Sequence, residues 1–323
     1  MSTVTVPDGS ATAASKAGRS VGARRGRVRR TEFWVYVFLL PTIGLYGLFT
    51  VYPIFASYWY SFLDWNGFDA VKTWVGLANY VEVLQDPLFW NAFKVTVLFT
   101  VVAVPVKVVL AFGLAMLLNS PRMPWKGFFR TAFFLPVVTT TAIVGIVMQF
   151  VFDPASGPVN LILIKLGLVG QGINFLGDSS SALWTVVGVF TWKWFGQTLI
   201  YWLAALQTIP TETYEAAAID GATNAKMTRY ITLPLLKPFT IIITLLTLES
   251  TLHVFDLMLT MTGGGPFYAT QVMEIFIYEA AFASSVPRLG YASAAAVLFG
   301  LFVCILGLVQ LLGVRAAQKA RQR

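Results

Sequence analysis

Six long apolar segments constrain this chain more than any other feature. Each holds about 20 or more mostly apolar residues, the length that an α-helix needs to cross the ~30 Å hydrocarbon core of a bilayer. Hydrophobic residues make up 57% of the 323 residues and charged residues only 12%, against roughly 45–50% and 25% in soluble domains. The sequence therefore predicts an all-α, polytopic membrane bundle with six transmembrane helices. The segments cover residues 33–62, 91–118, 128–152, 182–206, 235–262 and 290–314.

Polar tails flank the apolar part of the chain. Residues 1–31 are rich in Ser, Ala, Gly and Arg without apolar periodicity, which predicts a disordered N-terminal tail. The first apolar segment is too long for the hydrophobic region of a signal peptide, and no small-residue cleavage site follows it. We therefore expect one membrane domain over residues 32–315 and a short tail over residues 316–323.

The basic residues predict the orientation of the bundle. The formal net charge is +8, and 17 of the 23 Lys and Arg residues lie in the two tails, the second connection and the fourth connection. By the positive-inside rule, both termini and the loop between the fourth and fifth segments are cytoplasmic. Because the basic residues lie where a membrane protein places them, we do not expect a nucleic-acid partner.

Metal chemistry is not expected. Cys304 is the single cysteine and lies inside an apolar segment, and the chain has one histidine. A disulfide within the chain and the usual Cys/His metal clusters are therefore excluded, and the sequence predicts no metal site and no bound cofactor.

The fourth connection, about residues 208–234, carries the most informative motif. Its residue types predict a short helix that stops at Gly221 and a second helical piece that meets the next span at Pro234, since glycine adopts the left-handed conformation that ends a helix. The alanines leave a face that another protein can approach closely. An amphipathic turn lying in the membrane interface would use the same residue types. The motif reads Glu215-Ala216-Ala217-Ala218-Ile219-Asp220-Gly221-Ala222, followed by Tyr230-Ile231-Thr232-Leu233-Pro234.

This motif resembles the EAA signature of ABC importer permeases, in which the loop fits a cleft of the cytoplasmic ATPase. The flanking sequences Ala205-Leu206-Gln207 and Thr262-Gly263-Gly264-Gly265-Pro266 resemble the carbohydrate-uptake permeases of the maltose-transporter type, specifically the larger, MalF-like partner. The resemblance implies a prokaryotic cell-membrane permease subunit that moves a sugar or oligosaccharide. It also implies a cytoplasmic coupling helix between spans four and five, with the ATPase contact at Glu215, Ala216, Ala217, Asp220, Gly221 and Pro234.

The chain contains no G-x-x-x-x-G-K-[ST] sequence that could cradle ATP phosphates. We therefore expect a transport subunit rather than an enzyme, with ATP and Mg bound by separate subunits. The resemblance implies three kinds of protein partner: a second six-span permease, a cytoplasmic ATPase dimer and an extracytoplasmic solute-binding lipoprotein.

Polar residues inside the spans are the candidate substrate contacts. An ionisable residue at membrane depth costs about 2.5–3.5 kcal/mol, so it usually faces a cavity or a partner helix. Lys107, Lys193, Glu249, His253 and Asp256 are such residues. Pairing with one another or with a second permease is the competing interpretation. The resemblance places seven residues at sugar-contacting positions: Phe190, Lys193, Trp194, Gln197, Thr247, Thr251 and Val254. His253, a polar residue of the same fifth segment, is the eighth candidate.

Other functions stay open at this point. A related importer could carry a polyol, a glycerol phosphate or an amino acid, and the two intramembrane lysines keep an anionic substrate possible. An intramembrane enzyme could use Glu249, His253 and Asp256, but a nucleophile and a base normally converge from different elements rather than along one helix face. Neither an enzyme nor a channel or receptor explains the cytoplasmic EAA loop.

Overall fold

The computed structural model describes residues 21–120 and 123–321. The predicted tail lies outside the described residues as far as residue 20, and residues 322–323 of the C-terminal tail lie outside them too. The chain divides into two compact units, Met1–Trp59 and Tyr60–Arg323, which are described separately.

The first unit is helical throughout its described part. Helix α1 (Val21–Tyr46) passes through a π-helical turn, η1 (Gly47–Val51), into α2 (Tyr52–Tyr60). Residues 21–31, predicted as tail, belong to α1, because the helix of the apolar segment continues backwards through good helix formers such as Ala and Arg. Residues 34–60 are apolar enough to span a membrane, and none of them is buried.

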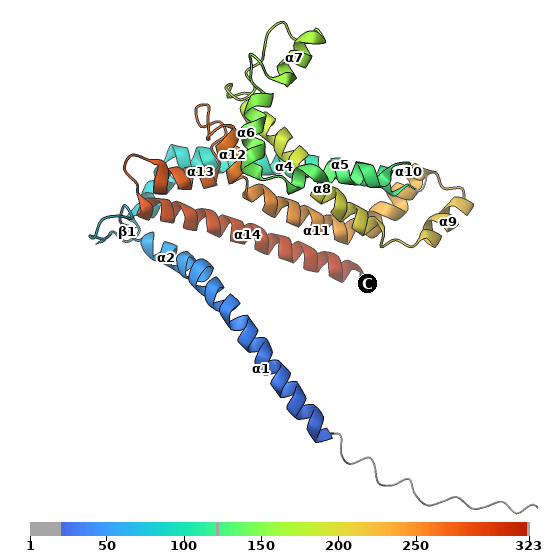
Figure 1. Ribbon diagram of the computed structural model, residues 1–323, viewed down its shortest axis with the longest axis horizontal. Helices are drawn as coiled ribbons and strands as arrows, with labels where there is room; N and C mark the ends of the chain where they lie inside the picture. The colour runs from blue at the N-terminus through green and yellow to red at the C-terminus, as the bar shows by residue number, and fades with distance from the viewer. Residues whose placement is uncertain (1–20, 121–122, 322–323) are drawn as a thin grey trace, which may run out of the picture. The chain divides into compact units, whose positions relative to one another are not determined.

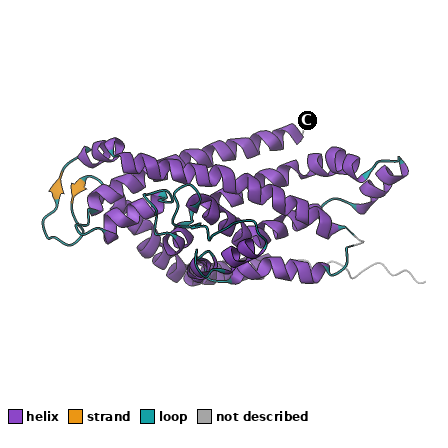
Figure 2. Cartoon of the chain, turned by 90° about the horizontal axis from the view of Figure 1, so that it is seen from above, coloured by secondary structure: helices purple, strands orange, loops and turns teal. Residues whose placement is uncertain are grey.

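Three helices form the centre of the second unit: α4 (Pro87–Asn119), α8 (Ala182–Leu206) and α11 (Leu233–Leu252). The rings of Phe99 and Phe190 pack edge to face at 5.1 Å, and Trp202 Nε1 donates to the carbonyl of Val108 at 3.1 Å. Positions along α4 and α8 therefore advance together, so these helices run parallel. Helix α14 (Leu289–Arg321) lies beside α11 (Figures 1 and 2).

The third apolar segment is bent rather than straight. Helices α5 (Lys126–Val138) and α6 (Thr141–Val151) meet at 100°, where Thr139 and Thr140 are extended (Figure 1). Pro136 lies one turn before the bend, where a proline weakens a helix. The single span predicted over 128–152 is therefore two helices.

The fifth apolar segment is also interrupted. A helical run of α10 (Asn224–Met227) and the π-turn η2 (Thr228–Thr232) leads directly into α11, with Pro234 in its first turn. The helix then breaks at His253 and Val254 before α12 (Phe255–Met261). The predicted span of 235–262 thus starts too late and merges two helices.

Most of the remaining elements lie towards the two ends of the second unit, whereas α7 projects from its middle (Figure 1). Strand β1 (Leu63–Asp64) pairs antiparallel with β2 (Thr73–Trp74), a small exception to the all-helical architecture. In Figure 1, β1 and α13 are at the opposite end of this unit from α9 and α10. The other helices are α3 (Ala78–Gln85), α7 (Pro158–Lys165), α9 (Thr211–Ile219), α13 (Met273–Tyr278) and the π-turn η3 (Glu279–Ala283).

The predicted all-helical polytopic bundle is confirmed at this level. Among the described residues, four helical stretches are long and apolar enough to span a membrane, and the bent α5–α6 pair is a fifth if it crosses as one. Helix α8 is long, but Lys193 and Gln197 lower its mean hydropathy. Its position in the core shields these polar side chains. The count of six spans stays a prediction. The four stretches are Trp34–Tyr60, Pro87–Asn119, Asn224–Leu252 and Leu289–Gly313.

Candidate functional site

Helix α9 (Thr211–Ile219) contains the start of the motif that resembles the EAA signature, and it ends as the sequence predicts. Gly221 has φ +75°, and the amide of Ala222 donates to the carbonyl of Ala217 at 2.9 Å. The amide of Gly221 donates to the carbonyl of Ala218 at 3.1 Å. This pair of bonds is a Schellman motif, which closes the last turn and turns the chain back towards α10.

The surface of α9 is open. Glu215, Ala216 and Asp220 are exposed, and Ile219 is 87% exposed. Its link to the bundle is Tyr214, whose hydroxyl lies 3.0 Å from Thr232 Oγ1 on η2. A helix held at one side and free on the other can receive a partner without unfolding.

The two remaining motif residues differ in exposure. Ala217 is half-buried, and Pro234 is exposed in the first turn of α11. Pro234 therefore lies on the continuous helix rather than at a separate junction.

The candidate substrate residues of α8 lie mostly inside this chain. Phe190 and Lys193 are buried, and Trp194 and Gln197 are half-buried. Gln197 Nε2 donates to the hydroxyl of Tyr201 at 2.8 Å. The polar groups of this face are therefore engaged within the helix or with its neighbours.

Lys193 has a structural partner at the α5–α6 bend. Its Nζ donates to the carbonyl of Thr139 at 2.8 Å and to that of Pro136 at 3.3 Å. The same ammonium lies 4.4 Å from the centre of the Trp194 ring. Gly196 allows α8 to approach α5 this closely, because a Cβ there would come within 2.2 Å of the Phe133 carbonyl oxygen.

The candidates on α11 and after it also face inward. Thr247, Thr251 and Val254 are buried, and the Thr251 hydroxyl donates to the carbonyl of Leu248 at 2.7 Å. The buried Thr247 hydroxyl has no hydrogen-bond partner among the described residues. Val254 shares a core cluster with Phe190, and Trp194 packs against that cluster. The fold thus brings Phe190, Trp194 and Val254 together.

A charged stripe on the break between α11 and α12 faces outward. Glu249, His253 and Asp256 are exposed. His253 Nε2 lies 3.5 Å from Glu249 Oε1, and His253 Nδ1 lies 3.2 Å from Glu274 Oε1. Glu274 Oε2 also accepts from the Phe255 amide at 2.8 Å, which caps the start of α12. Sequence reasoning missed Glu274, because it lies on α13 and reaches the break only through the fold.

The second intramembrane lysine lies close to the same core. Lys107 is 1% exposed, its Nζ donates to Ser250 Oγ at 3.1 Å, and it lies 4.8 Å from the centre of the Phe190 ring. In the described part of the chain, neither Lys107 nor Lys193 has a carboxylate within 4.0 Å. Two cations are therefore held in the bundle without a carboxylate partner from the described residues.

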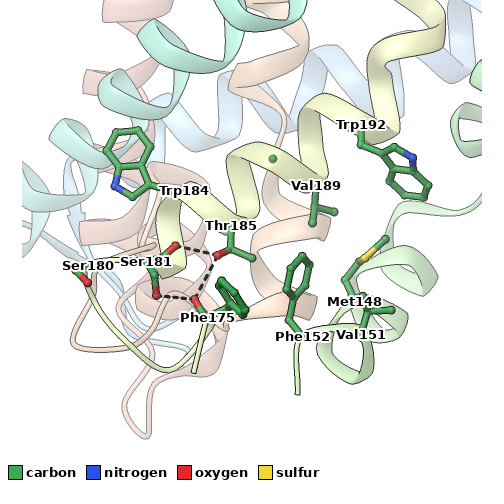
Figure 3. Close-up of a pocket in the computed structure, with 11 residues that line it drawn as sticks. Met148, Val151, Phe152, Phe175, Ser180, Ser181, Trp184, Thr185, Val189 and Trp192 are labelled. Carbon is green, nitrogen blue, oxygen red and sulfur yellow. Dashed lines mark hydrogen bonds between the residues drawn. The ribbon is translucent and has the colours of Figure 1, made fainter. Parts of the chain in front are cut away.

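A pocket of about 650 Å³ lies on a different face of α8 (Figure 3). Ser181, Thr185 and Trp192 recur along this face, and the rings of Phe152 and Phe175 lie across from it. The hydroxyls of Ser181 and Thr185 donate to the carbonyl of Phe175, at 3.0 Å and 3.4 Å respectively. None of the predicted substrate residues lines this pocket.

No group of three His, Cys, Asp or Glu side chains that could hold a metal ion occurs within residues 21–120 and 123–321. The His253 imidazole contacts two carboxylates, those of Glu249 and Glu274. Hydrogen bonding to a ligand hydroxyl is the chemistry that this arrangement can offer.

Comparison with known proteins gives a consistent result. Residues 107–318 match the family described as "Binding-protein-dependent transport system inner membrane component". The chain is 34% identical over 285 residues to the probable ABC transporter permease protein YurN of Bacillus subtilis (strain 168), covering 88% of this chain and 97% of that one. It is also 34% identical to the lactose transport system permease protein LacF of Rhizobium radiobacter, covering 87% and 93%.

A solved structure shares the fold. It belongs to a bacterial ABC transporter involved in the import of the acidic polysaccharide alginate. The TM-score is 0.76 at 24% identity, and the match covers 93% of this chain and 100% of that one.

Proposed function

Because this chain belongs to the binding-protein-dependent ABC transporter permeases of the carbohydrate-uptake family, we propose that it couples sugar passage to ATP hydrolysis through α9. It is a permease subunit of a sugar or oligosaccharide importer in the cell membrane, and the ATPase activity lies on partner subunits. The proposal concerns which residues transmit the coupling, which bind the substrate and how the chain is oriented.

One observation carries the coupling proposal: α9 is an exposed helix with a closed C-terminal turn. Glu215, Ala216 and Asp220 lie on its open surface, and Gly221 turns the chain back through the Schellman motif. Through η2 and α11, movement of α9 reaches the broken helix at His253. Closure of the ATPase can therefore shift the substrate-binding part of the bundle.

The substrate proposal rests on the inner faces of α8 and α11, on the buried Val254 and on the exposed His253 at the break after α11. Phe190, Trp194 and Val254 form its apolar side, and Gln197, Thr247, Thr251, Lys193 and His253 supply hydrogen-bonding groups. Sugars need both an aromatic platform and paired polar groups. Because several of these side chains are buried within this chain, binding requires the helices to separate, as alternating access does, and a second permease completes the path.

The remaining parts of the assembly follow from the family. The chain crosses the membrane six times, with α8 as the fourth span and both termini cytoplasmic, and it binds no cofactor itself. Its partners are a second six-span permease, a cytoplasmic ATPase dimer and an extracytoplasmic solute-binding protein. Another solved structure with this fold is of a bacterial alginate ABC transporter in complex with an alginate pentasaccharide-bound periplasmic protein.

An acidic saccharide is the second candidate substrate. Lys107 and Lys193 are held in the bundle without a carboxylate in the described residues. A relative from Agrobacterium fabrum is a sulfoquinovosyl glycerol transport permease. The exposed Glu249, His253 and Asp256 favour a neutral sugar instead, so the two classes belong in one test.

The test is a sugar panel on the complete transporter in nanodiscs. Neutral and acidic oligosaccharides, each with the solute-binding protein, are assayed for stimulation of ATP hydrolysis. We expect stimulation by one class, and loss of stimulation in Thr251→Val and Trp194→Ala with assembly unchanged. Normal stimulation in both variants would reject the proposed substrate residues, and stimulation by no sugar would reject the substrate class.

A further inference from the structure

The loop between α12 and α13 presents two aromatic side chains. Phe267 is 91% exposed and Tyr268 is 48% exposed, whereas Thr270 and Gln271 at the base of the loop are buried. Asn91 Nδ2, near the start of α4, donates to the carbonyl of Tyr268 at 2.9 Å. The loop is therefore fastened to the end of the bundle that lies away from α9 (Figure 1).

The backbone beneath the aromatic pair is in a rarely used conformation. Phe267 has φ +48° and Tyr268 has φ +62°. Residues other than glycine seldom adopt positive φ, and bulky side chains do so least. Such strain persists only where the surrounding structure imposes it, and it is concentrated at functional sites.

Hydrogen bonds impose this conformation. Thr270 Oγ1 donates to the carbonyl of Gly265 at 2.6 Å, and the Thr270 amide donates to that of Gly264 at 3.2 Å. The hydroxyls of Thr262 and Thr270 lie 2.7 Å apart. Gly264 has φ +86°, and a Cβ there would approach Ile275 to 3.3 Å. The loop is thus a fixed platform whose exposed part is aromatic.

We propose that Phe267 and Tyr268 form an aromatic anchor on which the extracytoplasmic solute-binding protein docks. This inference rests on the proposed function, which supplies the partner and the outward orientation of this end. Exposed aromatic residues dominate the binding energy of protein interfaces. A fixed backbone favours a protein partner over lipid, because ordering the anchor in advance lowers the entropy lost on binding, whereas a fluid bilayer accepts a mobile side chain.

The first test measures docking by its effect on ATP hydrolysis. In the complete transporter, Phe267→Asn removes the ring but keeps a residue that tolerates positive φ. The solute-binding protein concentration that gives half-maximal stimulation should rise about tenfold or more, with basal hydrolysis unchanged, since each 1.4 kcal/mol of lost binding energy is a factor of ten. An unchanged concentration would overturn the anchor.

Trp125→Asn is the matched control. Trp125 is 76% exposed with φ +58°, and it lies in the second connection, which is predicted to be cytoplasmic. The same substitution should there leave the dependence on the solute-binding protein unchanged. An equal shift in both variants would overturn the anchor as a specific contact.

The second test separates protein docking from anchoring in lipid. Phe267→Cys in a Cys304→Ala background provides a single labelling site for an environment-sensitive fluorophore. Its emission should change when the solute-binding protein is added and should resist quenching by spin-labelled lipids. Lipid quenching without a response to the protein would overturn the proposal. If wild type were not stimulated by the solute-binding protein at all, the proposed function would fail and the anchor with it.

Discussion

At the scale of single residues, Lys193 shows how an intramembrane charge can serve the fold. Its ammonium donates to the Thr139 and Pro136 carbonyls, where the α5–α6 bend interrupts regular helix bonding. A carbonyl left unpaired away from water is costly. Lys193 is therefore placed to hold the bend.

Lys193→Met should lower the unfolding temperature of the purified complex. Methionine fills a similar volume but leaves the Thr139 carbonyl without its donor, at a cost of about 1–3 kcal/mol. Lys107→Met is the matched control, because Lys107 contacts a hydroxyl and a ring rather than a bend carbonyl. Equal melting temperatures for wild type and Lys193→Met in a thermal shift assay would reject this role.

The ion pair between Arg288 and Glu82 makes the stability of the fold depend on pH. Arg288 donates to both carboxylate oxygens of Glu82 at 2.6 Å, and its hydrogen bonds lower the pKa of Glu82 below the usual range. A lowered carboxyl pKa stabilises the fold above the unfolded pKa of about 4.3, and this stability is lost as pH falls through the folded pKa. Both side chains are about half exposed, so the effect is at most about 1 kcal/mol.

Glu82→Gln should therefore melt slightly below wild type at pH 7. The difference should shrink towards zero as the pH falls below about 4. Melting curves of both proteins across this range test the expectation. A difference that grew on acidification would contradict the sign.

At the scale of elements, the turns and breaks of helices place the functional segments. The stop at Gly221 positions α9, the bend at Thr139 and Thr140 separates α5 from α6, and the break at His253 separates α11 from α12. Irregular backbone at membrane depth is tolerated where it is covered by protein or lines a cavity. We expect the bundle to move at these interruptions during transport.

Gly221→Val should uncouple ATP hydrolysis from substrate. A β-branched residue at φ +75° costs about 1–2 kcal/mol, and we expect it to displace α9. Gly221→Asn should retain most of the coupling, because asparagine tolerates the left-handed conformation. We expect the valine variant to reach the membrane and pair with the second permease, yet lose ATPase co-purification or stimulated hydrolysis. Normal stimulation would reject the coupling role of α9.

Part of the fold could be predicted from the sequence, because it follows from local residue preferences. Six apolar segments predicted the helical bundle, and Gly221 after a run of helix formers predicted where α9 ends. The sequence predicted one span over residues 128–152, because the α5–α6 bend is held by a contact with Lys193 from a distant helix. Glu274 was missed for the same reason, since its contact with His253 forms between different elements. The inward placement of Thr247 and Thr251 likewise follows from packing rather than from the pattern.

At the scale of the whole molecule, the account requires opposite ends of the second unit to face opposite sides of the membrane. Within this unit, α9 lies at one end and β1 and α13 at the other (Figure 1). The distribution of Lys and Arg predicts that the α9 end is cytoplasmic.

Cysteine labelling tests this orientation. In a Cys304→Ala background, Val71→Cys should react with an impermeant reagent added to intact cells, and Ile219→Cys should not. The native residues are similarly accessible in this chain, at 75% and 87% exposed, so sidedness rather than burial decides the result. Permeabilised cells, in which both sites should react, are the control. Labelling from outside at position 219 and not at position 71 would show that the orientation is the reverse of the predicted one.

Uptake into proteoliposomes tests whether ATP hydrolysis drives sugar through this permease. The complete transporter is reconstituted with ATP inside, and labelled sugar is added outside with or without the solute-binding protein. We expect sugar to accumulate above its external concentration only when both ATP and the solute-binding protein are present. We also expect Gly221→Val to abolish this accumulation. Equal uptake without ATP or without the solute-binding protein would contradict the account, because it would indicate a channel or an independent carrier rather than a permease driven through α9.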